Sequence, residues 1–222
     1  MFAFLKEGWP ALLLVAAVAY LFGSISSAII VTRLFSHKDI RDFGSGNAGA
    51  TNVLRSQGKL PALFTTLGDL GKSILSVAIG GWLMVTLVPG EYDEGMLRCF
   101  GCYLAGLFCV LGHMYPLFFG FRGGKGVMTT LGMMLLLDWR VALILLALFT
   151  VVVLCSRMVS LGSICAGICL PILTYVFRAY VDNAGSAIAW FCTVVTALIS
   201  AIAIFKHRGN IKRIIQGTEN KI

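Results

Sequence analysis

The sequence predicts an all-α integral membrane protein that crosses the bilayer about seven times, organised as a single domain over residues 1–222. Hydrophobic residues make up 58% of the chain and charged residues 13%, against about 45–50% and 25% in soluble domains. The mean hydropathy is +0.89. The apolar residues fall in long runs without charge, joined by short polar connections. A water-soluble globule of this size could not bury so much apolar surface.

Five of the spans are marked by windows free of Asp, Glu, Lys and Arg, because about 20 apolar residues cross a hydrocarbon core about 30 Å thick. The first window resembles a signal peptide, but six further apolar segments need packing partners, so we expect it to be retained as a span. The second window extends backwards through Asp69 and Lys72. The windows cover residues 8–32, 73–90, 99–121, 158–177 and 183–205.

A harder stretch lies between the third and fourth windows. Two apolar runs, residues 126–137 and 141–156, are separated by Asp138, Trp139 and Arg140. One continuous helix would place Asp138 and Arg140 at mid-membrane, which is costly. We interpret the stretch as a helical hairpin, either two short spans or a re-entrant pair. Both alternatives leave the sidedness of the rest of the chain unchanged.

The distribution of Lys and Arg between the connections predicts the orientation. Thirteen of these cations fall on one face and four on the other, with Lys72 inside a span. We therefore expect the amino terminus outside and the carboxyl terminus in the cytoplasm. The net charge of +8 then follows mostly from topology, which argues against a nucleic-acid partner. The seven cysteines lie in or beside apolar runs and are interpreted as core residues, so no metal or cofactor is predicted.

Four clusters of Gly, Ser, Asn, His and cations lie at the predicted cytoplasmic connections. A transporter or channel for phosphorylated solutes is one alternative, but it would concentrate polar residues within its spans, near the midplane. Here the spans are mostly apolar and the connections are rich in polar groups, so we expect chemistry at the boundary between membrane and cytosol. The clusters are residues 39–59, 113–130, 157–163 and 207–221.

The second cluster contains three glycines around a lysine, Gly123-Gly124-Lys125-Gly126, directly before an apolar helix. Glycines let backbone N–H groups turn toward one point, and the helix amino terminus and the Lys125 ammonium add positive potential, so the loop suits phosphate. It is not a Walker motif, since Gly126 occupies the Ser/Thr position. The structural alternative is a glycine turn with a lysine that reaches the membrane surface.

Two further clusters supply polar side chains. The first contains the run from Gly44 to Arg55, in which Arg55 can hold a phosphate through paired hydrogen bonds. A flexible loop that ends in a helix cap is the alternative. In the tail, His207 and Asn210 share one face if the segment is helical, although a histidine at a membrane exit is also an interfacial anchor.

His37 and Asp42 have the HxxxxD spacing of another acyltransferase class, in which the histidine is a base and the carboxylate orients it. This spacing recurs by chance and no accompanying Pro-Glu-Gly-type element follows it. We interpret the match as accidental. An enzyme of that class, using acyl-CoA, is the second alternative.

These residues make the chain resemble the bacterial membrane acyl-phosphate:glycerol-3-phosphate acyltransferase family over nearly its whole length. Its departures are small: Ser26 stands where proline is common, Ala48 replaces a larger aliphatic residue, and Tyr115 replaces phenylalanine. The resemblance is carried by Gly23-Ser24-Ile25, the run from Gly44 to Arg55, Gly112-His113 through Gly126-Val127, Ser160-Leu161-Gly162-Ser163-Ile164, and His207-Arg208-Gly209-Asn210-Ile211-Lys212-Arg213 with Gly217-Thr218-Glu219-Asn220-Lys221.

The resemblance implies a seven-helix enzyme of the bacterial cytoplasmic (inner) membrane with its active site facing the cytoplasm. It implies transfer of a fatty acyl group from acyl phosphate to the 1-hydroxyl of glycerol 3-phosphate, giving lysophosphatidic acid and inorganic phosphate in phospholipid biosynthesis. The family uses neither acyl-CoA nor acyl carrier protein as donor, and no cofactor is implied. The expected partners are the two substrates, the lipid bilayer and the upstream enzyme that forms acyl phosphate.

Carried over by position, the resemblance makes Ser45 and Arg55 an essential pair, the loop from Gly123 to Gly126 the phosphate site, and Glu219 a structural residue. The expected catalytic residues are Ser45, His207 and Asn210. The expected substrate-binding residues are Arg55, Asn47, Asn52, Gly123, Gly124, Lys125, Gly126, Thr129 and Ser163.

The expected reaction is direct attack of the glycerol hydroxyl on the acyl carbonyl, because phosphate is already a good leaving group. Arg55 and Lys125 can each bind the phosphate of one of the two phosphate-bearing substrates. For this reaction both cations must lie close to His207 at the boundary between membrane and cytoplasm. His207 or a substrate phosphate can accept the proton, and the sequence does not choose between them. Ser45 is either an acyl nucleophile or a hydrogen-bonding residue, and we favour the second role.

Overall fold

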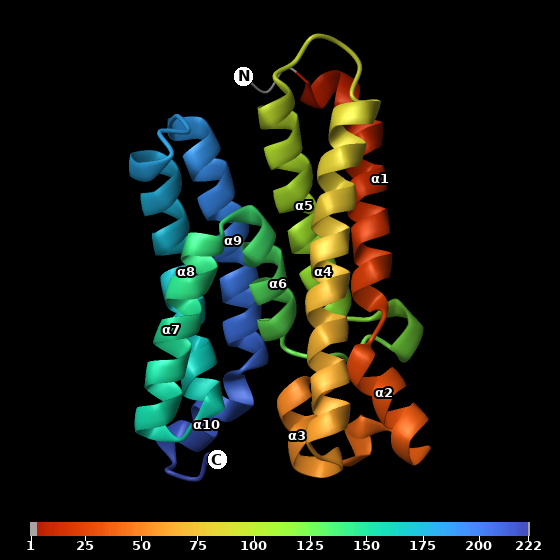
Figure 1. Ribbon diagram of the computed structural model, residues 1–222, viewed down its shortest axis with the longest axis vertical. Helices are drawn as coiled ribbons and strands as arrows, with labels where there is room; N and C mark the ends of the chain where they lie inside the picture. The colour runs from red at the N-terminus through yellow and green to blue at the C-terminus, as the bar shows by residue number, and fades with distance from the viewer. Residues whose placement is uncertain (1–3, 222) are drawn as a thin grey trace. The chain divides into compact units, whose positions relative to one another are not determined.

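The computed structural model describes residues 4–221, and this part of the chain is helical throughout, with short connections and no strand (Figure 1). The helices group into two compact units, Met1–Leu137 and Asp138–Ile222. The single-domain organisation stays a prediction. The first unit contains α1 (Leu5–Ser24), α2 (Ser27–Ser36), η1 (Ile40–Asp42), α3 (Ala50–Gln57), α4 (Lys59–Leu87), α5 (Glu94–Met114), η2 (Leu117–Phe119) and α6 (Val127–Leu137). The second contains α7 (Trp139–Ser156), α8 (Val159–Val176), a π-helical turn (Phe177–Val181), α9 (Ser186–Lys206) and α10 (Arg208–Ile215).

Six helical segments of the described chain are long and apolar enough to cross a membrane. Helix α6 is also apolar but has only 11 residues. Each of these seven segments coincides with an apolar run identified in the sequence, so the predicted all-α membrane fold is confirmed. The number of crossings and the orientation stay predictions. The six longer segments are Leu5–Ser36, Lys59–Leu87, Glu94–Phe119, Trp139–Ser156, Val159–Val181 and Ser186–Lys206.

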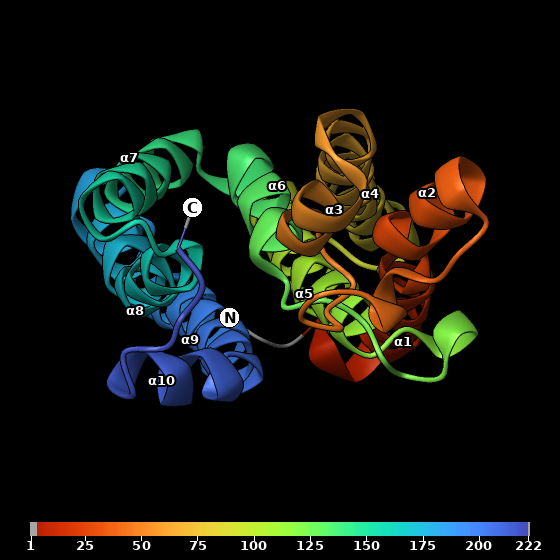
Figure 2. The same cartoon turned by 90° about the horizontal axis from the view of Figure 1, so that it is seen from below.

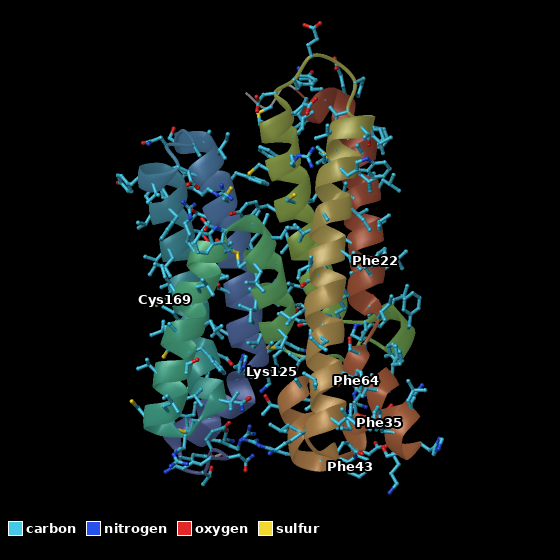
Figure 3. The ribbon with its side chains drawn as sticks, in the orientation of Figure 1. Phe22, Phe35, Phe43, Phe64, Lys125 and Cys169 are labelled. Carbon is cyan, nitrogen blue, oxygen red and sulfur yellow. The ribbon has the colours of Figure 1, made fainter. Side chains whose placement is uncertain are left out.

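Helices α1, α4 and α5 lie side by side as the bundle of the first unit (Figures 1 and 2). Glycines allow their close approach: a Cβ added to Gly112 of α5 would overlap the carbonyl oxygen of Tyr20 in α1, and one added to Gly101 would overlap the carbonyl oxygen of Gly80 in α4. Small residues of this kind let transmembrane helices pack backbone to backbone. Helix α2 packs on α4, where the rings of Phe35 and Phe64 lie 6.0 Å apart between centroids (Figure 3).

The first apolar run is interrupted, which the charge-free window did not predict. Helix α1 ends at Ser24, Ile25 is extended with ψ 104°, and α2 begins at Ser27. The Ser24 hydroxyl donates to the carbonyl of Tyr20 at 2.8 Å and accepts the amide of Leu117 at 3.2 Å. The break is therefore tied to the segment after α5, which is invisible in a hydropathy window.

In the second unit α8 packs against both α7 and α9. The predicted interruption before α7 is confirmed, and its cause is a helix cap: the Asp138 carboxylate accepts the amides of Arg140 at 3.1 Å and Val141 at 3.4 Å. Arg140 also donates to Asp138 and Asp182, each through Nη2, at 2.9 and 2.8 Å. The pair therefore lies at the start of α7 instead of in the middle of a continuous helix. Whether α6 and α7 are two short spans or a re-entrant pair stays open as predicted.

Candidate active site

The glycine loop, residues 121–126, follows α5 and η2 and leads into the start of α6. Its first two glycine amides are already used: Gly123 donates to the carbonyl of Met114 at 3.3 Å, and Gly124 donates to the carbonyl of His113 at 3.1 Å. They do not turn toward a phosphate as the sequence analysis expected of successive amides. These two amides are therefore occupied, and the predicted cation of the loop, Lys125, follows them just before α6 (Figure 3).

The two glycines are required because the loop lies directly against the end of α5. A Cβ on Gly123 would overlap the carbonyl oxygen of His113. A Cβ on Gly124 would overlap Nε2 of the His113 imidazole and lie 2.7 Å from the carbonyl oxygen of Ala48. Gly126 has φ +83°, a left-handed conformation that favours glycine. The glycines thus give the loop its close seat on α5.

Ala48 belongs to the first polar cluster, so its approach to Gly124 joins two stretches that are far apart in the sequence. Within the first unit the structure brings together the loop that carries Ser45 and the loop that carries Lys125. Beneath the Ser45 loop lies an apolar cluster that anchors it to α2, α3 and α4. This cluster consists of Ala28, Ile29, Ile40, Ala48, Val53 and Ala62.

Asn52 organises the Ser45 loop. Its buried side chain accepts the amide of Ser45 at 3.1 Å and donates to the carbonyls of Phe43 at 2.9 Å and Asn47 at 3.1 Å, with a longer bond to Ile40 at 3.2 Å. Both its oxygen and its nitrogen serve the loop. The structure therefore supports a positioning role for Asn52, whereas Ser45 and Arg55 are exposed to solvent. The predicted contact of Asn52 with substrate stays a prediction.

Thr129 lies in the first turn of α6, and its side chain is fully buried. Its hydroxyl donates to the carbonyl of Gly126 at 2.9 Å. This bond closes the start of the helix over the glycine loop, so the structure shows Thr129 stabilising the loop. The predicted contact of Thr129 with substrate is not tested by this arrangement.

A cluster of ionisable groups that the sequence analysis did not include in the site lies next to the glycine loop. Lys72 Nζ is 2.9 Å from Asp69 Oδ1 and 3.0 Å from His113 Nδ1, and it donates to the carbonyl of Ile25 at 2.7 Å. All three ionisable side chains are buried. The signal in the sequence was present: two charges at i and i+3 inside an apolar helix are unusual and often functional in a membrane.

In the second unit Asn210 is part of a hydrogen-bonded cluster around Glu219. The Glu219 carboxylate accepts Asn210 Nδ2 at 2.6 Å, Ser160 Oγ at 2.8 Å and Arg213 Nε at 2.8 Å. Burial raises the pKa of Glu219, but the hydrogen bonds from Asn210, Ser160 and Arg213 outweigh burial and hold the pKa below its usual range. The carboxylate therefore ties the tail after α10 to the start of α8 and fixes the amide of Asn210.

His207 lies at the junction of α9 and α10 with only 4% of its surface exposed. Its Nδ1 is 2.8 Å from the carbonyl oxygen of Ala203. A carbonyl only accepts, so Nδ1 carries the proton, and in the neutral ring Nε2 carries the lone pair that a base requires.

Ser163, on the first turns of α8, donates its hydroxyl to the carbonyl of Val159 at 3.0 Å.

The HxxxxD pair has no resemblance to a catalytic dyad. His37 is the exposed C-cap of α2, with φ 57°, and Asp42 is exposed at the end of η1. The carboxylate that organises this turn is Asp39, which accepts Arg41 Nε at 3.0 Å. The hydrogen bond from Arg41 lowers the pKa of Asp39 to about 2. This turn is held by an ion pair between two of its own residues.

The chain is similar to known glycerol-3-phosphate acyltransferases over nearly its whole length. The sequence profile of the family described as glycerol-3-phosphate acyltransferase matches residues 13–217. A glycerol-3-phosphate acyltransferase of Clostridioides difficile is 42% identical over 210 residues, covering 95% of both chains. One of Gloeobacter violaceus is 39% identical over 214 residues, covering 96% of both.

Two solved structures have the same fold. The crystal structure of PlsY (YgiH), an integral membrane glycerol 3-phosphate acyltransferase, in its glycerol 3-phosphate form superimposes with a TM-score of 0.77 at 34% identity, covering 95% of each chain. The lysophosphatidic acid form of the same protein gives a TM-score of 0.74 at 33% identity. The similarity therefore extends over the sequence and the fold together.

Proposed function

The chain belongs to the glycerol-3-phosphate acyltransferase family, and from this premise we propose that it transfers a fatty acyl group from acyl phosphate to the 1-hydroxyl of glycerol 3-phosphate. The products are lysophosphatidic acid and inorganic phosphate. The solved relative with forms named for glycerol 3-phosphate and lysophosphatidic acid supports the acceptor and the product. The choice of acyl phosphate as donor is supported by the motifs that the chain shares with the family.

The observation that carries the proposal is the approach of Gly124 to Ala48 in the first unit. It brings the Ser45 loop, which leads into the helix α3 that carries Arg55, together with the loop that carries Lys125. An acyl phosphate has one apolar tail and one anionic head, so it suits a place where an apolar surface meets cations. Arg55 and Lys125 are the proposed holds for the two phosphate groups.

In the proposed reaction the glycerol oxygen attacks the acyl carbonyl carbon, a new ester C–O bond forms, and the C–O bond to phosphate breaks. The hydroxyl proton passes to Nε2 of His207 or to a substrate phosphate. The short contact from His207 Nδ1 to the Ala203 carbonyl supports the first acceptor, because it leaves Nε2 as the basic atom. Asn210, held by Glu219, orients the acceptor substrate in this proposal.

Ser45 is proposed to hydrogen-bond substrate instead of forming an acyl-enzyme. Its exposed side chain lies on a loop whose backbone Asn52 fixes, and the donor needs no further activation. Rapid quench with labelled donor tests this point. An acyl group trapped on Ser45 during the first turnover would overturn the proposal. Labelled product formed with no label bound covalently to the enzyme supports direct transfer.

We also propose that the enzyme works in the cytoplasmic (inner) membrane of a bacterium, with its amino terminus outside and its site facing the cytoplasm. The excess of cations in the connections of one side supports this orientation. The site would then receive acyl phosphate from the upstream enzyme that forms it. The buried charges of α4 bond to one another and to α5, which does not favour a transport pathway.

The experiment uses purified protein in detergent with glycerol 3-phosphate and either acyl phosphate or acyl-CoA. Product from acyl phosphate alone, retained in His37→Ala, is the expected result. Product from acyl-CoA that disappears in His37→Ala would select the HxxxxD alternative. Absence of product from both donors, with uptake of glycerol 3-phosphate into protein-loaded liposomes, would select the transporter.

A further inference from the structure

Asp69, Lys72 and His113 are buried together in the first unit, with 1%, 7% and 5% of their surfaces exposed. Asp69 and Lys72 lie on α4 and His113 on the last turn of α5. No step of the proposed reaction uses them. Ionisable groups are expensive inside a transmembrane bundle and are rarely present without a role. This cluster therefore needs an explanation of its own.

Short polar contacts join the three side chains. Lys72 Nζ has three polar atoms around it: the Ile25 carbonyl oxygen at 2.7 Å, Asp69 Oδ1 at 2.9 Å and His113 Nδ1 at 3.0 Å. His113 Nδ1 also lies 3.5 Å from Asp69 Oδ1. The imidazole is therefore held on its Nδ1 side by both charged groups of α4, which leaves its Nε2 side toward Gly124.

His113 fixes Gly124 in two ways. Its carbonyl oxygen accepts the amide of Gly124 at 3.1 Å, and its Nε2 lies so close to the α-carbon of Gly124 that a methyl group there would overlap it. The next carbonyl, that of Met114, accepts the amide of Gly123 at 3.3 Å. The orientation of the ring that carries Nε2 is in turn set by Lys72. The position of the glycine loop thus depends on α4 through one side chain.

The cluster also reaches the other loop. By bonding to Ile25, Lys72 holds the break between α1 and α2. Helix α2 contributes Ala28 and Ile29 to the apolar cluster that contains Ala48. Lys72 is therefore linked to both segments indirectly, to Gly124 through His113 and to Ala48 through Ile25 and α2.

We infer that Asp69, Lys72 and His113 are positioning residues that hold the glycine loop in its anion-binding conformation, with Lys72 orienting His113 and His113 seating Gly124. The inference rests on the proposed function in one respect, namely that the anion bound beside this loop is a substrate phosphate. The positioning itself is a property of the protein and can be measured without turnover.

The first test is hydrogen–deuterium exchange of the peptide that covers residues 121–127, in detergent. The variant is Asp69→Asn combined with Lys72→Met, which preserves size and net charge and so leaves no buried unpaired charge. We expect the loop amides to exchange about tenfold faster, because the variant lowers the free energy that local opening of the loop requires. Ser76→Ala, a buried change one turn along α4, is the matched control and should exchange like the wild type.

Exchange of this peptide at the wild-type rate in the folded double variant would overturn the inference. If the double variant does not fold, His113→Gln serves in its place, because glutamine keeps the size and polarity of the ring but not the paired contacts to Lys72 and Gly124. Faster exchange confined to residues 121–127 supports the inference, and wild-type exchange again overturns it.

The second test separates positioning from a general loss of stability. In the folded double variant we expect the KM for one of the two phosphate-bearing substrates to rise about tenfold, while the KM for the other stays within about twofold. Wild-type values of both KM and kcat would overturn the inference. A wild-type enzyme that does not use acyl phosphate at all would refute the proposed function, and the exchange experiment would still decide the positioning role.

Discussion

Lys72 Nζ lies 3.0 Å from His113 Nδ1, although the two residues are 41 positions apart in the chain. This contact joins α4 to the end of α5, where His113 lies against the glycine loop. The loop that the sequence identifies as a phosphate site is thus supported by His113 and, through it, by Lys72, which lies in a helix outside the four polar clusters.

Lys125→Ala should lower turnover about 100-fold or more, because the change removes a cation proposed to hold a phosphate group during transfer. Insertion and melting temperature should be unchanged. Arg122→Ala, an exposed cation of the same connection, is the matched control and should retain nearly full activity. Steady-state kinetics with both substrates check this, and equal activity of the two variants would contradict the assignment.

Gly124→Ala should destabilise the protein by about 1–3 kcal/mol and abolish most of its activity, since the added methyl group overlaps the His113 imidazole and approaches Ala48. Gly71→Ala on α4 is the control, because a Cβ there meets no atom within 4 Å. Replacement of a helical glycine by alanine is expected to be neutral or to stabilise by up to about 1 kcal/mol. Thermal unfolding in detergent measures both. A Gly124→Ala protein as stable as Gly71→Ala would be incompatible with the close seat described above.

Asn52→Ala should cost about 1–3 kcal/mol, because it leaves buried loop groups without their partners. It should also reduce turnover by releasing the Ser45 loop. Asn52→Asp keeps an acceptor for the Ser45 amide but loses the donors to Phe43 and Asn47, so it should be impaired as well. Limited proteolysis of the loop, compared with Gln57→Ala at the end of α3, checks the cause. Intact protection in Asn52→Ala would show that this side chain does not organise the loop.

Acid should loosen the tail around Glu219. The pKa of this carboxyl is lower in the folded protein than its ordinary value near 4.5, so its contribution to stability is complete above that value and is lost as the pH falls through the lower folded-state pKa. Hydrogen exchange of the tail peptide between pH 6 and pH 3, corrected for intrinsic rates, measures the loss. Glu219→Gln should show weak protection that hardly depends on pH, and an acid-induced loss identical to that of the wild type would contradict this account.

The fold was largely predictable because each long helix is an apolar run limited by charge or glycine. The break before α7 was predictable for the same reason, since Asp138 and Arg140 are local signals. The break between α1 and α2 was not, because the Ser24 hydroxyl is bonded to a segment 93 residues away. Hydropathy contains no information about such a partner.

The candidate site likewise has features that the sequence could predict and features that it could not. The glycines around Lys125 indicate that the loop backbone lies close to other parts of the chain, and the structure shows this close approach at His113 and Ala48. The sequence could not show that the amides of Gly123 and Gly124 are used internally, since this depends on where the end of α5 lies. Lys72 was interpreted only as a charge inside a span, because its partners outside α4 come from the break between α1 and α2 and from the end of α5.

The central claim is acyl transfer from acyl phosphate, and the most direct measurement follows both products in one reaction with purified wild-type enzyme. We expect inorganic phosphate and lysophosphatidic acid to appear in equal amounts, and neither to appear when glycerol 3-phosphate is omitted. Phosphate released without the lipid product, or lipid product formed only when acyl-CoA replaces acyl phosphate, would contradict it.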